Sequence, residues 1–447
     1  MLLKERVFSS VALIVFVIGI AGTGSVFGEI IHVDCDATGA NDGSSWEDAY
    51  TDLQDALADA ASGDQIWVAE CVYKPTAGSE TSARFSLVDG VEMYGGFAGG
   101  ETSLEERDYE QNKTYLSGDL GSGIESSRIV LTNGVGAATI LDGFEITGGY
   151  RGIYSYQSEE IISNCVISQN SGDGIYCNES GPAMDNCIIE DNEQDGINPD
   201  NQSSVAITGC IIRNNGQNGI YCYGGSTVIK NNWIHHNGDD GILFYDPALV
   251  PDVGNNTIVY NWGDGVRKSD ASGENPDIYN CILWGNAGDE LDLCDATYSC
   301  IEGGDTSGGN IAADPNFLHH VSVDYDPNHC DLHLSSISPC MDVGDPSRDY
   351  AGEVDIDGEP RVIDIPDIGD GVVDVDMGAD EVRYDTNPAD LTGEGKVDYR
   401  DFVIFAMAWQ SEEGLGSWNP ACDFVVDGLV DMKDLAFFGV QWGFGWR

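Results

Sequence analysis

The sequence predicts a mainly β protein, a right-handed parallel β-helix made of three-strand coils of 22–25 residues. The first observation behind this prediction is an internal repeat of asparagines at intervals of 22 to 25 residues. Such a period is typical of stacked repeat proteins, in which each unit buries its apolar side chains against its neighbours. The repeating residues are Asn170, Asn192, Asn215, Asn237, Asn261 and Asn286.

Further columns with the same period define the strands. An aliphatic residue stands three positions before each asparagine, and a second position, held mostly by cysteine, stands two positions before that. Side chains two apart on a strand point to the same side, so these columns predict a continuous inner core. The members are Ile167, Ile189, Ile212, Ile234, Ile258 and Leu283; Cys165, Cys187, Cys210 and Cys281; and, seven positions after the aliphatic residue, Gly174, Gly196, Gly219, Gly241 and Gly265.

We interpret the asparagines as structural. Asparagine tolerates the left-handed turn conformation, and its amide can hydrogen-bond to the asparagine of the next coil. A ligand-binding role is the alternative, but ladders of identical residues are what coil stacking selects.

The N-terminal region departs from the repeat. Residues 1–28 place Lys4 and Arg6 before the apolar stretch Val11–Ile20. They end in Val26-Phe27-Gly28, small or tolerated residues at the positions a signal peptidase reads, so the pattern predicts a cleaved signal peptide. A secreted or cell-surface location follows from this prediction. No segment of the mature chain is long and apolar enough to predict a transmembrane helix.

The β-helix is expected over residues 29–383, with an N-terminal helix capping its first coil. An amphipathic stretch runs from Ser45 to Ala60, in which Ser45 and Asp48 are spaced as a capping box. Stacked coils need such a cap because the first coil otherwise presents unpaired strand edges to water.

The charge of the chain excludes one class of partner. Acidic residues outnumber basic ones by 77 to 19, giving a formal charge of −58. Phosphate backbones repel such a protein, so nucleic acid is excluded as a main partner. The acidic surplus is explained either by solvation in salt water or by bound divalent cations.

Thirteen cysteines in an exported chain predict disulfides. The cysteines of the inward column are interpreted as small packing residues. Pairs are expected in the irregular flanks: Cys35 with Cys71, Cys294 with Cys300, and Cys330 with Cys340.

Residues 384–447 contain a second repeat with a period of 33 residues. Each copy has a twelve-residue loop with oxygen-bearing side chains, a glycine at position 6, and an apolar segment after it. This spacing matches the loop that wraps carboxylate oxygens around Ca²⁺. Asp390, Gly395, Asp398, Asp401 and Trp409 recur as Asp423, Gly428, Asp431, Asp434 and Trp442.

These loops resemble those of type I dockerin modules. The resemblance implies that Ca²⁺ binds at the family's ligand positions and that the module attaches to a cohesin-type or surface scaffold. Val425 replaces an oxygen ligand in the second loop, which puts its metal binding in doubt. The implied ligands are Asp390, Thr392, Glu394, Asp398 and Asp401 in the first loop, and Asp423, Asp427, Asp431 and Asp434 in the second.

The repeats of residues 30–383 resemble the pectate-lyase-like β-helix superfamily, which implies the fold more strongly than any activity. Lyases of this fold typically use clustered aspartates on Ca²⁺ with an arginine or lysine base, and its glycosidases use grouped aspartates. The sequence matches neither signature.

One outward face is the candidate functional site. Glu190, Arg213 and His235 occupy one outward column on successive coils and are the catalytic candidates. Aromatic and imidazole rings nearby could stack on sugar rings. The alternative is a solvated face with cross-coil ion pairs. The next column holds Asp191, Asn214, His236 and Tyr260, and the carbohydrate-binding candidates are Trp233, His236, Tyr260 and Trp284.

An acidic column also recurs beside the glycines. Stacked carboxylates would raise one another's pKa unless water or cations screen them, so a calcium-bridged edge is one hypothesis. Ordinary Asp-Gly turn chemistry is the alternative. The column contains Asp173, Asp195, Asn218, Asp240, Asp264 and Asp289.

Together these features predict a secreted or cell-surface protein for carbohydrate binding or adhesion, with a polysaccharide or cell-surface glycan as its partner. The alternative is a polysaccharide lyase or glycoside hydrolase. A purely structural spacer is the third class.

Overall fold

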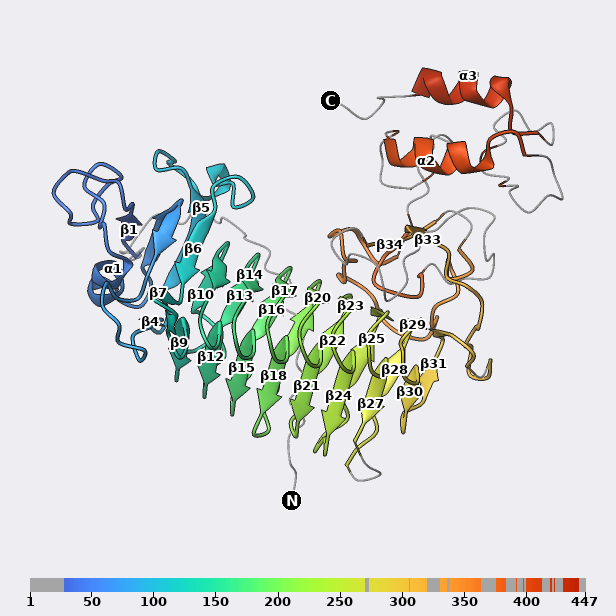
Figure 1. Ribbon diagram of the computed structural model, residues 1–447, viewed down its shortest axis with the longest axis horizontal. Helices are drawn as coiled ribbons and strands as arrows, with labels where there is room; N and C mark the ends of the chain where they lie inside the picture. The colour runs from blue at the N-terminus through green and yellow to red at the C-terminus, as the bar shows by residue number, and fades with distance from the viewer. Residues whose placement is uncertain are drawn as a thin grey trace, which may run out of the picture.

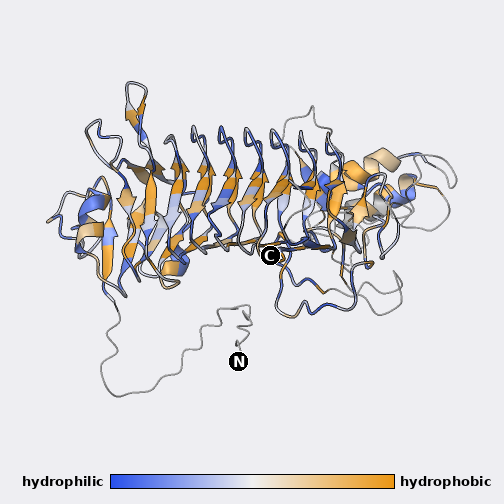
Figure 2. Cartoon of the chain, turned by 90° about the horizontal axis from the view of Figure 1, so that it is seen from below, coloured by the Kyte–Doolittle hydropathy of each residue, from blue (hydrophilic) through white to orange (hydrophobic). Residues whose placement is uncertain are grey.

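The computed structural model describes residues 28–269, 273–304, 306–319, 330–335, 338–362, 375–382, 391, 397, 399–411, 419, 422 and 429–441. It shows a right-handed parallel β-helix with three long parallel sheets. Its coils stack along one axis (Figure 1). Apolar residues follow the strands, while hydrophilic residues gather at many of the turns (Figure 2).

Each coil contributes one strand to each sheet. Sheet A contains β1 (Ile30–Val33), β2 (Gln65–Ala69), β5 (Glu92–Phe97), β10 (Ile140–Asp142), β13 (Ile161–Ser163), β16 (Ala183–Asp185), β19 (Ala206–Thr208), β22 (Val228–Lys230), β25 (Asp252–Gly254), β28 (Asp277–Tyr279) and β31 (Ala296–Thr297). Sheet B contains β3 (Cys71–Tyr73), β6 (Thr114–Ser117), β11 (Glu145–Thr147), β14 (Val166–Ser168), β17 (Ile188–Glu190), β20 (Ile211–Arg213), β23 (Trp233–His235), β26 (Thr257–Val259), β29 (Ile282–Trp284) and β32 (Cys300–Ile301).

The third sheet and the remaining elements complete the described chain. Sheet C contains β4 (Phe85–Ser86), β9 (Val130–Asn133), β12 (Ile153–Tyr156), β15 (Ile175–Asn178), β18 (Ile197–Asp200), β21 (Ile220–Tyr223), β24 (Ile242–Tyr245), β27 (Val266–Lys268) and β30 (Leu291–Asp292). The other elements are two antiparallel pairs, β7 (Asp119–Gly121) with β8 (Ile124–Glu125) and β33 (Phe317–His319) with β34 (Asp331–Leu334), the 3₁₀ helix η1 (Leu104–Glu106), and the α-helices α1 (Leu53–Asp59), α2 (Tyr399–Ala408) and α3 (Met432–Gln441).

The predicted columns are confirmed as stacked neighbours in sheet B. Ile167 pairs with Ile189, and the register continues through the whole aliphatic column to Leu283. Every member of that column is fully buried. The inward cysteines are also buried, so both columns build one continuous core inside the coils.

The asparagine ladder is confirmed, but its backbone conformation differs from the prediction. From Asn170 to Asn286, each side-chain Nδ2 donates to the Oδ1 of the next asparagine at 2.9–3.0 Å. The left-handed φ belongs instead to the residue before each asparagine, for example Asn214 at 55° before Asn215. This turn residue aims the following amide inward, where it can reach its neighbours.

The glycine column leaves room for this ladder. A Cβ at Gly196 would lie 2.7 Å from the Gly219 carbonyl oxygen and 2.8 Å from Asn215 Nδ2. Contacts this short are closer than real side chains tolerate, so glycine is required by space. The turn can therefore approach the next coil closely enough for the amides to bond.

The first coil lies against α1, which is shorter than predicted. The helix begins after Asp52, whose side chain accepts from the Gln54 backbone N–H, whereas Ser45 and Asp48 bond each other in a turn before it. Leu53, Ala56 and Leu57 are the buried positions of α1, which contacts β1, β2 and β4. The short apolar stripe of α1 accounts for the late start of the helix. The capping role of α1 stays a prediction.

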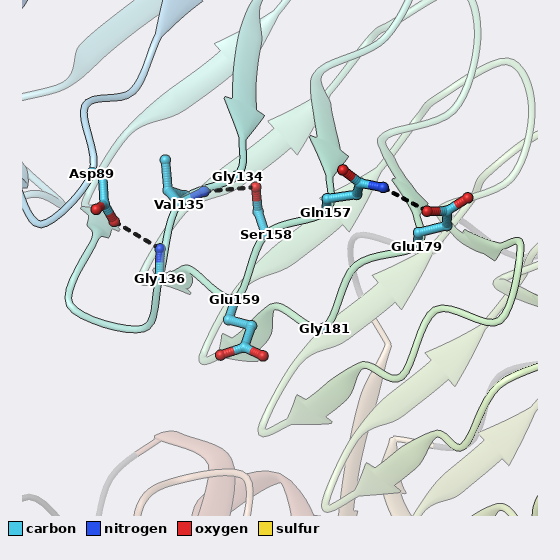
Figure 3. A pocket seen from close by; sticks show the side chains of 9 residues that line it. All are labelled: Asp89, Gly134, Val135, Gly136, Gln157, Ser158, Glu159, Glu179 and Gly181. Carbon is cyan, nitrogen blue, oxygen red and sulfur yellow. Dashed lines mark hydrogen bonds between the residues drawn. The ribbon is translucent and has the colours of Figure 1, made fainter.

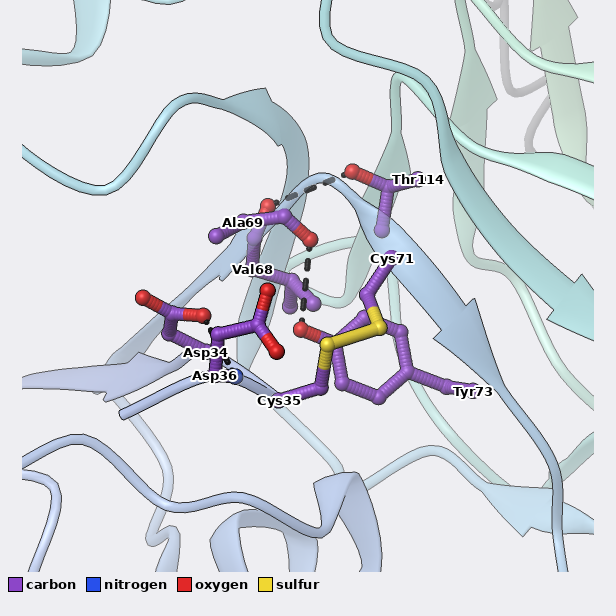
Figure 4. The surroundings of a disulfide bond; sticks show 8 residues. All are labelled: Asp34, Cys35, Asp36, Val68, Ala69, Cys71, Tyr73 and Thr114. Atoms are coloured by element: carbon purple, nitrogen blue, oxygen red, sulfur yellow. Dashed lines mark hydrogen bonds between the residues drawn. A yellow bond between two sulfur atoms is a disulfide. The ribbon is translucent and has the colours of Figure 1, made fainter. Parts of the chain in front are cut away.

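One predicted disulfide is confirmed. Cys35 and Cys71 are bonded, with an S–S distance of 2.04 Å, and tie the end of β1 to β3 (Figure 4). The other two pairings are wrong, because Cys294, Cys300, Cys330 and Cys340 are free thiols. Cys300 in β32 instead shares the second core with Cys340 from a later segment, a spatial neighbour that sequence spacing did not indicate.

A second hydrophobic core forms outside the coils. It lies between the outer face of sheet B and residues 311–319, 330–335, 338–362 and 375–382, which we call the cover. Strands β33 and β34 of the cover lie over the last coils (Figure 1). Residues 355–358 and 375–378 of the cover are irregular and include turns and bends. The Asp355 and Asp376 carboxylates hold these turns by accepting backbone N–H groups.

The two apolar segments predicted in the C-terminal region are helices α2 and α3. Phe405 and Phe438 stack with ring centroids 5.3 Å apart and are buried in a small core of their own. Among all described residues, no helix has the length and apolar character needed to cross a membrane. Residues 1–27 and most of the two loops lie outside the described residues.

We expect Asn215→Ala to lower the free energy of unfolding by at least about 2 kcal/mol, because it leaves the buried donors of Asn192 without their acceptor. Urea unfolding followed by circular dichroism measures this loss. Asn133→Ala, at an exposed strand end, is the matched control and should change stability by less than about 0.5 kcal/mol. Equal effects of the two variants would contradict a stabilising role for the ladder.

Candidate functional site

The register brings the three catalytic candidates together. Glu190 pairs with Arg213, which pairs with His235 on the next coil. Arg213 Nε donates to Glu190 Oε2 at 2.7 Å, and both side chains are about one-fifth exposed, at 19% and 20%. The charges of Glu190 and Arg213 therefore neutralise each other at the edge of the cover.

Most of the predicted aromatic platform lies in the second core. Trp233, His235, His236 and Tyr260 are buried, and only Trp284 among the candidate rings is half-buried. The Trp233 ring meets His333 of the cover edge to face at 4.9 Å. A sugar would reach the buried rings only after the cover moved, so their carbohydrate role stays a prediction.

Burial also sets the ionisation of His235. Desolvation lowers its pKa well below the usual range, and the nearby charges of His236 and Arg213 act in the same direction. The imidazole is therefore neutral at neutral pH. Its Nδ1 lies 2.8 Å from His236 Nδ1, so the two rings share one hydrogen bond.

The outer face of sheet B remains open over the earlier coils. A shallow groove of about 170 Å³ runs there, with Val166, Ile188 and Ile211 stacked on its floor. Tyr109 and Lys113 line one side, and Ile356 of the cover also lines it. We call this feature the sheet B groove. The parallel column Ser168, Glu190 and Arg213 runs beside the apolar one, so the face is apolar along one line and polar along the next.

A hydrogen-bonded network stiffens one side of the sheet B groove. Arg107 pairs with Asp142, whose other oxygen accepts from Asn164 Nδ2 at 2.8 Å. Asn186 donates to Asn164 at 2.7 Å, and Tyr109 donates to the same amide oxygen at 3.4 Å. The network places amide groups and a phenol along the groove before any ligand arrives.

A second hollow, of about 430 Å³, lies on the turns beyond sheet C (Figure 3). Its carboxylates are Asp89, Glu159 and Glu179, and Gln157 donates to Glu179 at 2.7 Å. Asp89 accepts the Gly136 backbone N–H at 2.9 Å. The acidic lining would repel an anionic glycan, so this hollow is the weaker candidate for sugar binding.

The acidic column has protein partners within the coils. Asp195 accepts from Asn218 Nδ2 at 2.8 Å, and Asp240 accepts the Asp264 backbone N–H at 2.8 Å. Arg267 lies 3.6 Å from Asp240. Burial nevertheless raises the pKa of Asp195 and of Asp240 to about 6. Turn hydrogen bonding thus accounts for these aspartates, and the calcium-bridged edge stays a hypothesis.

Three of the nine implied calcium ligands can be placed. Asp401 and Asp434 are fully buried in the first turns of α2 and α3, and Asp431 lies just before α3. Buried carboxylates at position 12 of each loop fit a hard cation such as Ca²⁺. Asp390, Thr392, Glu394, Asp398, Asp423 and Asp427 lie outside the described residues.

Sequence reasoning missed the cover, although the outward columns carry a signal for it. In the column that holds Glu190 and Arg213, the outward residue changes to Val259 and then Trp284 in the last coils. Outward apolar side chains in consecutive coils indicate that another segment packs there.

The comparisons with known proteins agree with this architecture. Residues 128–283 match a family model described as a right handed beta helix region. No curated protein sequence matches the chain. Among solved structures, pectate lyase Pel9A is similar at a TM-score of 0.54 and 16% identity, covering 78% of this chain and 96% of that one.

Two weaker structural similarities accompany it. The A-module of mannuronan C-5 epimerase AlgE4 from Azotobacter vinelandii gives a TM-score of 0.30 at 16% identity, covering 56% of this chain and 93% of its own. A rhamnogalacturonan lyase gives a TM-score of 0.30 at 11% identity, covering 65% of this chain and 91% of that one. Scores this low support no structural argument, whereas the similarity to Pel9A shows a shared fold.

We expect Asp195→Asn to raise stability at pH 7 by up to about 2 kcal/mol. Because its pKa of about 6 lies above the ordinary value, the folded state binds the proton more tightly than the unfolded state. This carboxyl therefore adds stability as pH falls through 6 toward 4, and loses that contribution as pH rises through 6.

Urea unfolding of both proteins from pH 4 to pH 8 tests this expectation. The stability difference should shrink toward zero near pH 4, since the wild-type carboxyl is then protonated. The exposed Glu70→Gln is the control and should give a difference independent of pH. A variant less stable than wild type at pH 7 would show that Asp195 is held as a carboxylate.

Proposed function

We propose that this chain is an exported protein that binds an extended polysaccharide along the sheet B groove. The observation that carries the proposal is the pairing of an apolar column, Val166, Ile188 and Ile211, with a polar column on one open face. A sugar ring has an apolar C–H face and a hydroxylated rim, so such a surface complements it. The Cys35–Cys71 disulfide supports export, because such bonds persist in oxidising compartments.

The length of the groove suits a short run of sugar units. Its floor crosses the coils of β11, β14, β17 and β20, which are spaced about 4.8 Å apart. The open face therefore spans about 14 Å. Tyr109 offers a ring for stacking, while Asn164 and Asn186 offer amides to hydroxyl groups.

The charged groups along the groove favour binding over cleavage. Lys113 is paired with Glu145 at 2.8 Å, and Arg213 with Glu190 at 2.7 Å. His235 is buried beneath the cover. A base must reach its proton directly or through one water. A polysaccharide lyase or glycoside hydrolase using Glu190, Arg213 and His235 remains the second candidate, since an acid and a cation do meet at the groove edge.

The C-terminal helices support a role as an attachment module. Their buried Asp401 and Asp434 would complete calcium loops that fold only with the ion bound. In this proposal the module holds the β-helix at a cohesin-type or surface scaffold, while the groove holds the glycan.

We expect Tyr109→Ala to weaken binding to a recognised oligosaccharide about tenfold, the loss of one stacking contact. Calorimetry against acidic and neutral oligosaccharides measures it. Tyr223→Ala, an exposed tyrosine of sheet C, is the matched control and should bind as wild type does. The proposed groove would be wrong if both variants bound equally well.

The same oligosaccharides should be monitored for unsaturated products and for new reducing ends. Retention without turnover supports a binding protein. Product formation that disappears in Arg213→Ala or His235→Ala would instead establish the enzyme alternative. If the protein shows neither binding nor turnover, the structural spacer is the class that remains.

We also expect Asp401→Asn to weaken calcium binding of the full chain at least tenfold, because it removes a buried carboxylate ligand. Asp434→Asn should have a smaller effect, since Val425 already lacks an oxygen in that loop. Calcium titration calorimetry measures both, with the exposed Asp59→Asn in α1 as control. A wild-type chain that binds no calcium would contradict the proposed module.

A further inference from the structure

We propose that His235, His236 and Cys330 form a transition-metal site, suited to Zn²⁺, between sheet B and the cover. One ligand atom from each residue lies within 4.8 Å of the other two. Two imidazoles and a thiolate are the borderline-soft ligand set that zinc prefers. None of the three residues lines the sheet B groove.

The backbone explains how adjacent histidines come to share one site. Successive residues of a strand point to opposite sides, so His235 and His236 would normally diverge. His236 has a left-handed φ of 56°, which turns the chain directly after β23. The two Nδ1 atoms consequently face each other at 2.8 Å.

The residues at this turn depart from the pattern of the other coils. In earlier coils the position of His236 is held by Gln169, Asp191 and Asn214, all with a left-handed φ. The change to a ring occurs at His236 and Tyr260, where the cover packs on the solenoid. Asparagine and aspartate suit that φ better than tyrosine does, so turn formation alone does not account for both rings.

The third ligand comes from the cover. Cys330 lies directly before β34, whose Leu332 and Leu334 are buried in the second core. Packing of these leucines fixes the start of the strand beside sheet B. Cys330 is half-buried, whereas His235 and His236 are 1% and 5% exposed. An ion would therefore reach the site from the side of the thiol.

The distances require only small movements. Zinc bonds of about 2.0–2.1 Å to nitrogen and 2.3 Å to sulfur hold tetrahedral ligand atoms about 3.3–3.6 Å apart. The two Nδ1 atoms would separate by about half an ångström, and the sulfur would move closer by up to about 1.2 Å. Side-chain rotation supplies shifts of this size. A water would serve as the fourth ligand.

A neighbouring histidine in the same core has a different set of partners. His333 bonds Asp331 through Nδ1 at 2.5 Å and Asp357 through Nε2 at 2.9 Å. Both ring nitrogens are thus held by carboxylates in partly exposed ion pairs. The His235–His236 pair faces a thiol instead, which is why the metal is assigned there.

The proposed site would fasten the cover to the solenoid. His235 and His236 belong to the coil of β23, whereas Cys330 is almost 100 residues later in the chain. A metal bridge between such distant segments closes a long loop, which is where a cross-link contributes most. Zinc should therefore stabilise the cover more than the earlier coils.

The test uses the full-length protein, stripped with chelator and then titrated with Zn²⁺ or Co²⁺ in excess Ca²⁺, which occupies the oxygen-ligand loops. We expect one zinc per chain by elemental analysis. The cobalt form should show a thiolate-to-cobalt charge-transfer band. His236→Gln and Cys330→Ser should each lower zinc affinity at least hundredfold, and Cys330→Ser should abolish the band.

Matched controls separate the site from general thiol or imidazole binding. Cys294→Ser removes another half-buried thiol, and His32→Gln removes another half-buried imidazole; both should bind zinc as wild type does. Cys330→His keeps a ligand, so it should retain zinc while losing the charge-transfer band, even if Cys330→Ser proves unstable. A wild-type chain that takes up no zinc, or a Cys330→Ser chain with unchanged metal content and cobalt spectrum, would overturn the proposal.

Discussion

The buried ladder of asparagine amides fixes which residues of successive coils become neighbours. An isoleucine stack disfavours a one-residue shift, which would turn its side chains out of the core, but it specifies no individual partner. Each amide, in contrast, donates to the next asparagine and to a backbone carbonyl while accepting from the previous coil, as Asn215 does. A shift of one residue would leave several buried polar groups unpaired, which costs far more than a lost apolar contact. The straight columns of the outer face follow from this constraint.

Much of this constraint could be predicted from the sequence. The aliphatic column, the amide ladder and the Cys35–Cys71 bond were predicted correctly, because stacking turns a sequence period into a spatial contact. The left-handed φ was assigned one residue too late, to Asn215 instead of Asn214. A repeat shows which columns exist, but the conformation at each position depends on how the turn approaches the next coil.

The candidate site was harder to predict for a physical reason. Period and register correctly aligned Glu190, Arg213 and His235. Their exposure depends on the cover, which has no repeat and reaches sheet B through contacts between distant segments such as Cys300 and Cys340. Only the outward apolar residues Val259 and Trp284, which continue the column of Glu190 and Arg213, indicated that the last coils are covered. Local patterns therefore locate a face of a solenoid but not what packs on it.

The restriction of the cover to the last coils leaves the middle of the solenoid modular. Strands β14, β17 and β20 share one register, and each pairs with the strands of the coils before and after it. Inserting or deleting a complete coil there would create a single new junction of a kind already present. Related chains could thus change the reach of the open face in steps of about 4.8 Å while both ends stayed intact.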